Sequence, residues 1–205
     1  MTRDVVLVPG LWMPGAAMAL FAARLARRGY SPRVFVYRGR SPFDANVERL
    51  ARFVHESLEG RAAHFVGHSL GGVLILEMLN RHPEIPVSSA VLLGAPVRGS
   101  LSGRRLRSQP FGRWMLGASE PRWAHCEARW RRSEPLGVVA GTLPLGLGRV
   151  LGRLPGQNDA VVCVDETTVE GMTARALVPE GHSMLIISGR VANLVDRFFA
   201  AGRFA

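Results

Sequence analysis

Ten residues, Ala63-His64-Phe65-Val66-Gly67-His68-Ser69-Leu70-Gly71-Gly72, set the architecture of the chain. The first four form a short, mostly apolar run with the length of a buried strand. Residues 70–81, which follow the run, are predicted to form a helix. A glycine-rich turn centred on Ser69 therefore joins a strand to a helix.

Strand-like and helix-like segments alternate on both sides of this turn. Short apolar runs predict strands at 5–8, 33–37, 63–66, 89–93, 136–140 and 175–178, with a further short strand at 161–164. Apolar residues at helical spacing predict helices at 15–28, 43–58, 70–81 and 191–201. This alternation is typical of a parallel sheet with right-handed crossovers, so we expect an α/β fold.

Length and composition exclude several classes of protein. The chain has 205 residues, of which 47% are hydrophobic, which predicts a single domain (residues 1–205) with a full core and excludes disorder as its main state. No run approaches the roughly 18 apolar residues of a membrane span, and the first residues do not resemble a signal peptide. Cys126 and Cys163 lack the number and spacing of a disulfide framework or a zinc site. A reduced, cytoplasmic setting is therefore expected.

The basic residues are unusual in kind and in position. The net charge is +10, all 26 basic residues are arginine, and nine of them lie between Arg98 and Arg132. One interpretation is a coding bias towards arginine with a solvated basic face; the other is attraction to an anionic membrane surface, substrate or partner. A nucleic-acid binder usually mixes lysine and arginine, so we do not expect a nucleic-acid partner.

The regular alternation stops between residues 97 and 135. This segment is predicted to be either a short cap over the site or a modified crossover, and its spacing of Trp123, Cys126 and Trp130 after Pro121 indicates a short amphipathic helix. Its aromatic residues either line a substrate pocket or fill the core. In the first case, the substrate pocket contains Trp12, Trp114 and Met115.

Ser69 is the candidate nucleophile. It lies in the pattern G-x-S-x-G, between a predicted strand and a predicted helix. A serine on such a sharp turn exposes its Oγ, and Gly67 and Gly71 are small enough to let the strand and the helix approach. The positive end of the helix dipole at Leu70 stabilises negative charge there.

A serine hydroxyl needs a base, which in turn needs an orienting acid. His182 follows the last predicted strand, at the edge where open parallel sheets bind their ligands, and His125 is the alternative base. Between Ser69 and His182 in chain order, Asp159 lies in a turn that leads into apolar residues. Three other acidic residues of this stretch remain alternatives for the acid: Asp165, Glu166 and Glu170.

These motifs resemble those of the α/β-hydrolase superfamily, and within it the small bacterial lipases and esterases. The resemblance rests on the elbow Gly67-His68-Ser69-Leu70-Gly71, the acid turn Asn158-Asp159-Ala160-Val161-Val162 and the pair Gly181-His182. It implies a three-layer sandwich with a mostly parallel sheet of about six strands. Two positions depart from the family pattern: Pro9 replaces a histidine and Ala160 replaces a glycine.

The resemblance also implies a reaction. Ser69, Asp159 and His182 would form a catalytic triad, and the backbone N–H groups of Leu11 and Leu70 would form the oxyanion hole. The expected activity is hydrolysis of a small-molecule or lipid carboxylic ester through an acyl-enzyme, without a metal or a cofactor. An acyltransferase or thioesterase would use the same triad, and a non-catalytic binding protein on this fold is the third alternative.

Overall fold

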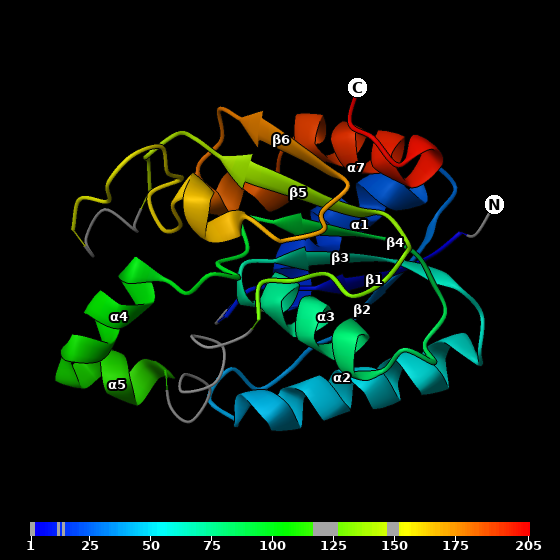
Figure 1. Cartoon of the computed structure of the whole chain (residues 1–205), viewed down its shortest axis with the longest axis horizontal. Helices are drawn as coiled ribbons and strands as arrows, with labels where there is room; N and C mark the ends of the chain where they lie inside the picture. Colours follow the sequence, from blue (N-terminus) through cyan, green and yellow to red (C-terminus); the bar gives the residue numbers. More distant parts are fainter. Residues whose placement is uncertain (1–2, 12, 14, 117–126, 147–151) are drawn as a thin grey trace.

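Six strands form one parallel sheet in the order β2-β1-β3-β4-β5-β6 (Figure 1). The computed structural model describes residues 3–11, 13, 15–116, 127–146 and 152–205. The strands are β1 (Asp4–Val8), β2 (Ser31–Val34), β3 (Ala63–His68), β4 (Val87–Leu93), β5 (Leu136–Gly141) and β6 (Ala174–Val178). Every neighbouring pair is parallel, which confirms the predicted sheet.

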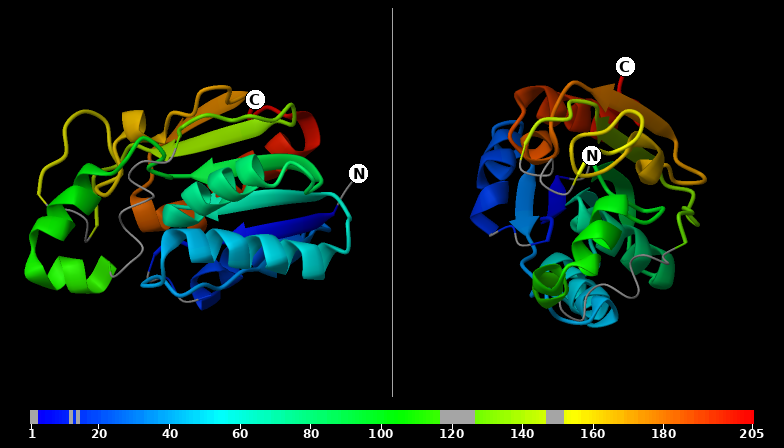
Figure 2. Two further views of the ribbon diagram at one scale, coloured as in Figure 1. Left: turned by 60° about the horizontal axis from the view of Figure 1, so that its bottom comes forward. Right: turned by 90° about the vertical axis from the view of Figure 1, so that its left-hand side faces the viewer.

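Helices cover both faces of the sheet, so the molecule has three layers (Figures 1 and 2). On one face lie α2 (Phe43–Leu58) and α3 (Leu70–Arg81), and on the other lie α1 (Ala19–Ala26) and α7 (Gly189–Ala201). Two further helices, α4 (Leu101–Ser108) and α5 (Pro110–Leu116), stand beyond the carboxyl ends of the strands. Short 3-10 helices are η1 (Gly15–Met18), η4 (Val164–Thr167) and η5 (His182–Ile186).

The apolar side chains of the strands divide between two cores, one on each face. In β1, Val6 and Val8 belong to the core under α2 and α3, whereas Val5 and Leu7 belong to the core under α1 and α7. All four side chains are fully buried. A strand covered on both faces needs apolar residues at successive positions, which explains the continuous apolar run in the sequence.

The predicted strand at 161–164 does not form. Instead, the Asp159 carboxylate accepts hydrogen bonds from the backbone N–H groups of Val161 (3.0 Å) and Val162 (2.7 Å). These donors are then not available to a strand ladder, because a backbone N–H that is bonded to a side chain cannot also pair with a neighbouring strand. The chain bends through this turn and enters η4 at Val164.

The predicted helix between Pro121 and Trp130 is wrong over its last residues. Residues 127–130 are not helical, and Arg129 forms a bridge with Glu170, whereas residues 121–126 lie outside the described part. Trp130 is buried in the core under α2 and α3, and its indole N–H donates to the carbonyl oxygen of Glu134. This tryptophan therefore fills the core.

Over the described ranges, none of the helices combines the length and the apolar character needed to cross a bilayer.

Candidate active site

The three predicted catalytic residues lie at the carboxyl edge of the sheet. Ser69 follows β3, Asp159 lies in the loop after β5, and His182 is the first residue of η5 after β6. This edge is where parallel sheets bind their ligands, because loops from several strands converge there. The fold thus gathers residues that are 90 and 23 positions apart in the chain.

Ser69 has a strained backbone conformation. Its φ and ψ are 53° and −127°, a combination that residues other than glycine rarely adopt. The two flanking glycines permit the turn: a Cβ on Gly67 would lie 2.5 Å from Cα of Gly72, and a Cβ on Gly71 would lie 2.3 Å from the Val8 carbonyl oxygen. The predicted need for small residues at both positions is confirmed.

Asp159 and His182 form a buried pair. The Nδ1–H of His182 donates to Oδ2 of Asp159 at 2.7 Å, and the side chains are 11% and 1% exposed. The backbone N–H of His182 donates to the Asp159 carbonyl oxygen at 3.0 Å, so the two residues are fixed to each other twice. Because Nδ1 carries the proton, Nε2 of a neutral His182 is an unprotonated acceptor.

The acid turn keeps its shape although alanine replaces the family glycine. Ala160 has a φ of 78°, in the left-handed region that normally favours glycine. Its backbone N–H donates to Oδ1 of Asn158 at 3.0 Å, and the Asn158 amide donates to the Gly156 carbonyl oxygen. These side-chain bonds hold the turn in place of the conformational freedom that glycine would give.

Gly94 is a site residue that the sequence analysis missed. It directly follows β4 and has a φ of +55°, and a Cβ there would lie 3.1 Å from Oδ2 of Asp159 and 3.3 Å from Nδ1 of His182. Any larger residue would crowd the hydrogen bond between the two side chains. A glycine directly after a predicted strand was the available signal.

His68 is the second site residue that was missed. The ring lies against His182, with centroids 4.6 Å apart, and Nε2–H donates to the His182 carbonyl oxygen at 3.0 Å. The side chain is 1% exposed, and among the described residues its Nδ1 has no hydrogen-bond partner. His68 therefore packs against His182 and helps to fix its position.

Burial keeps His68 neutral. Desolvation, followed by the proximity of His182, lowers the pKa of His68 from 6.5 to about 3. Between these values the unfolded chain binds a proton here that the folded chain does not, so stability falls as the pH falls. At about 1.4 kcal/mol per pH unit, this residue should lower the free energy of unfolding by about 2 kcal/mol on going from neutral pH to about pH 5.

Urea unfolding at several pH values tests this expectation. His68→Gln retains an amide donor for the His182 carbonyl but does not titrate, so its stability should depend less steeply on pH than that of the native chain. His55→Gln on α2 is the control, because His55 is exposed. If the two variants showed the same slope, His68 would not be the source.

A second turn lies beside Ser69. A Cβ on Gly10 would be 3.0 Å from both Ser69 Cβ and His68 Nδ1, so the segment after β1 passes directly over the elbow. The Tyr37 hydroxyl donates to the Pro9 carbonyl oxygen at 3.2 Å and fixes this segment from the side.

Leu11 follows Gly10, and Leu70 is the first residue of α3, whose first-turn N–H groups have no partner within the helix. Their role as oxyanion donors stays a prediction.

Comparison with known proteins now assigns the family. The sequence pattern described as the alpha/beta hydrolase family matches residues 5–199. The chain belongs to the alpha/beta hydrolase family. No functionally curated protein matches it in sequence.

Solved structures similar to this α/β hydrolase include esterases and other hydrolases. A metagenomic carboxyl esterase shares 21% identity and a TM-score of 0.69 over 87% of this chain, which spans 64% of that protein. A pyrethroid hydrolase shares 17% identity and a TM-score of 0.65 over 98% of both chains. A carboxylesterase from Bacillus subtilis shares 15% identity and a TM-score of 0.65 over 98% of this chain and 84% of its own. At these identities the likeness establishes the fold.

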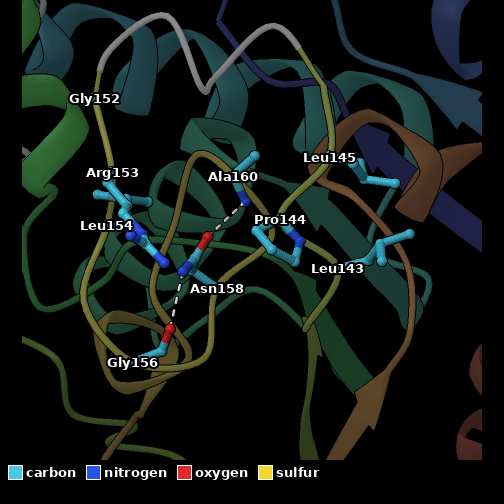
Figure 3. A pocket seen from close by; sticks show the side chains of 9 residues that line it. All are labelled: Leu143, Pro144, Leu145, Gly152, Arg153, Leu154, Gly156, Asn158 and Ala160. Atoms are coloured by element: carbon cyan, nitrogen blue, oxygen red, sulfur yellow. Dashed lines mark hydrogen bonds between the residues drawn. The ribbon is translucent and has the colours of Figure 1, made fainter.

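A cavity of about 810 Å³ borders the acid turn of this α/β hydrolase (Figure 3). One wall is the segment 143–145, the facing wall is 152–154, and the turn with Asn158 and Ala160 lies between them. A Cβ on Gly181 would lie 2.6 Å from the Leu145 carbonyl oxygen, so the cavity wall also touches the residue before His182. The lining residues are Leu143, Pro144, Leu145, Gly152, Arg153, Leu154, Gly156, Asn158 and Ala160.

The predicted pocket residues are placed only in part. Trp114 lies on α5, is 59% exposed and stacks on Phe111. Trp12 and the alternative base His125 lie outside the described residues, as does the side chain of Met115. The assignment of Trp12, Trp114 and Met115 to the substrate pocket thus stays a prediction. Across the described ranges, no three His, Cys, Asp or Glu side chains are arranged to hold a metal ion.

Proposed function

We propose that this α/β hydrolase cleaves carboxylic esters through an acyl-enzyme on Ser69. The observation that carries the proposal is the largely buried hydrogen bond between Asp159 and His182, at the same edge of the sheet as a serine in a strained, partly exposed elbow. The structural likeness to carboxyl esterases supports the choice of an ester. A small-molecule or lipid ester is the proposed substrate class.

The proposed reaction has two halves. In the first, Nε2 of His182 takes the Ser69 hydroxyl proton while Oγ attacks the ester carbonyl carbon, and the resulting oxyanion is stabilised by the N–H groups of Leu11 and Leu70. The imidazolium then protonates the leaving alkoxide, which departs as an alcohol. In the second, His182 takes a proton from water, whose oxygen attacks the acyl carbon, and the same proton returns to Ser69 as the acid leaves.

The neighbouring groups prepare this chemistry. Asp159 holds His182 in the Nδ1–H tautomer and stabilises the imidazolium that forms in each half. Two backbone donors on the other carboxylate oxygen keep Asp159 oriented. Ser69 supplies the nucleophile, His182 the general base and general acid, and Asp159 the orienting carboxylate, so the proposed reaction needs no cofactor.

A first experiment separates the alternatives. A fluorophosphonate should label Ser69 if it is an activated nucleophile, and p-nitrophenyl esters from acetate to palmitate should be hydrolysed. An acyltransferase would release little free acid, and an added alcohol or thiol would resolve its acyl-enzyme as a new ester or thioester. Absence of both labelling and turnover would instead favour a binding protein on this fold.

The cavity beside the acid turn is proposed to hold the longer arm of the ester. Its leucines suit an alkyl chain, and Leu145 is 55% exposed, so a larger residue fits there without disturbing the core. Leu145→Trp should lower kcat/KM for long acyl chains about tenfold and leave acetate turnover nearly unchanged. Leu20→Trp on α1, where Leu20 is 42% exposed, is the control. An equal loss for all chain lengths would contradict the assignment.

A cytoplasmic setting is part of the proposal. The Cys163 thiol is free and buried, and it donates to the Pro155 carbonyl oxygen. Desolvation raises the pKa of this thiol to about 11, which favours the protonated, unreactive form. Both features suit a reducing compartment.

A further inference from the structure

Helices α4 and α5 form a surface that the ester chemistry does not use. They stand away from the sheet at the edge that carries Ser69 and His182 (Figures 1 and 2). The base of α4 is fixed to the body, because the N–H of Leu101 donates to the Glu166 carboxylate and the Arg105 guanidinium donates to the Arg153 carbonyl oxygen. Helices α4 and α5 therefore form a projection from the sheet that is anchored at its base.

The charge of this projection has one sign. Between residues 101 and 116 the sequence contains four arginines and no acidic residue: Arg104, Arg105, Arg107 and Arg113. Arg104, Arg107 and Arg113 are exposed. A surface of this kind attracts anions and raises their local concentration.

The same projection exposes two large aromatic side chains. Phe111 is 67% exposed and Trp114 is 59% exposed, and they stack on each other at i and i+3 on α5. Such rings are normally buried in a protein core, so their exposure indicates an interaction surface. Because arginines lie beside them, the partner should have an anionic surface with an apolar layer beneath it.

We propose that α4 and α5 dock this α/β hydrolase on an anionic phospholipid bilayer. Arg104 and Arg113 contact the headgroups, and Phe111 and Trp114 enter the boundary between headgroups and acyl chains, where aromatic residues are most stable. Docking in this orientation turns the carboxyl edge of the sheet towards the bilayer.

The aromatic geometry favours lipid over nucleic acid. A single-stranded nucleic acid would need the flat face of a ring for base stacking. The guanidinium of Arg40 lies over the Trp114 ring, 4.7 Å from its centroid, and Phe111 stacks against the same ring. These contacts occupy ring surface that a base would use, whereas ring edges can still enter a lipid interface.

Vesicle sedimentation measures binding alone and uses the ether-linked forms of the phospholipids, which contain no carboxylic ester, so its outcome is independent of the proposed hydrolysis. The native chain should bind vesicles of phosphatidylcholine with about one-third phosphatidylglycerol much more tightly than vesicles of phosphatidylcholine alone. Binding should weaken when salt is raised to about 0.5 M, because surface charges are then screened.

Two matched sets of variants identify the surface. Arg104→Gln with Arg113→Gln should weaken binding to anionic vesicles about tenfold or more, since each surface arginine contributes about fivefold. Arg52→Gln with Arg190→Gln removes the same charge from α2 and α7 and should have little effect. Phe111→Ala with Trp114→Ala should weaken binding about tenfold, and Leu177→Ala on β6 is the apolar control.

Three results would overturn the proposal. The first is equal binding to neutral and anionic vesicles, and the second is an equal loss in the control arginine pair. The third is tighter binding to a single-stranded oligonucleotide than to the vesicles at the same salt, with the same dependence on Phe111 and Trp114, which would assign the surface to nucleic acid. Thermal unfolding of each variant shows whether a loss of binding reflects a loss of fold.

Discussion

Ser69→Ala and His182→Ala should each lower ester turnover by about three orders of magnitude or more while the chain stays folded. Alanine at 69 removes the atom that forms the acyl-enzyme, and alanine at 182 removes the group that takes its proton. Because nucleophile and base act as a unit, the double variant should be hardly worse than either single variant. Steady-state hydrolysis of a p-nitrophenyl ester measures all three.

Two exposed residues of the same types provide the controls for these two variants. Ser183 follows His182 and is exposed, and His55 on α2 is exposed as well, so Ser183→Ala and His55→Ala should keep native turnover. A fluorophosphonate should label both controls and should fail to label Ser69→Ala. Turnover near the native level in purified Ser69→Ala would end the proposal that Ser69 is the nucleophile.

The regular elements could be predicted because their signals are local. Helices 43–58 and 70–81 were predicted with the bounds that the structure has, since apolar spacing and flanking turn residues are both present in the sequence. The strand at 161–164 was predicted wrongly for the opposite reason. The segment has the apolar residues of a strand, but the backbone N–H groups of Val161 and Val162 donate to the Asp159 carboxylate. Strand propensity takes no account of such side-chain hydrogen bonds, which compete with strand pairing.

The candidate site was predicted where chain order carries the information. Ser69, Asp159 and His182 each follow a strand of a parallel sheet, so the fold itself brings them to one edge. His68 and Gly94 were missed because their roles depend on distances across the sheet. The ring of His68 reaches a carbonyl 114 residues away, and the missing side chain of Gly94 leaves room for a hydrogen bond between two other loops.

The acid of the candidate triad can be distinguished from its alternatives by their surroundings. Asp165 is exposed, and Glu170 is exposed beside Arg129. Glu166 is already engaged, because its carboxylate accepts from the backbone N–H groups of Leu101 (2.6 Å) and Cys163 (2.9 Å). Of these acidic residues, Asp159 is the one that the structure pairs with His182.

Asp159→Asn should therefore lower turnover by about three to four orders of magnitude, and Asp165→Asn should leave it nearly unchanged. The asparagine can still accept from Val161 and Val162 through Oδ1, so the turn should survive. Its Nδ2 would then face Nδ1 of His182 as a donor, which forces the imidazole proton onto Nε2 and leaves no base for Ser69.

A variant of Glu166 distinguishes a loss of catalysis from a loss of stability. Glu166→Gln retains one acceptor oxygen and should weaken the link between η4 and the base of α4, so it should lower stability more than it lowers turnover. Asp159→Asn is expected to be inactive because it gives His182 the wrong tautomer. Its turnover should therefore stay low at every pH at which the variant is folded. If Asp165→Asn or Glu166→Gln lost more turnover than Asp159→Asn, the orienting acid would lie downstream of the turn that holds Asp159.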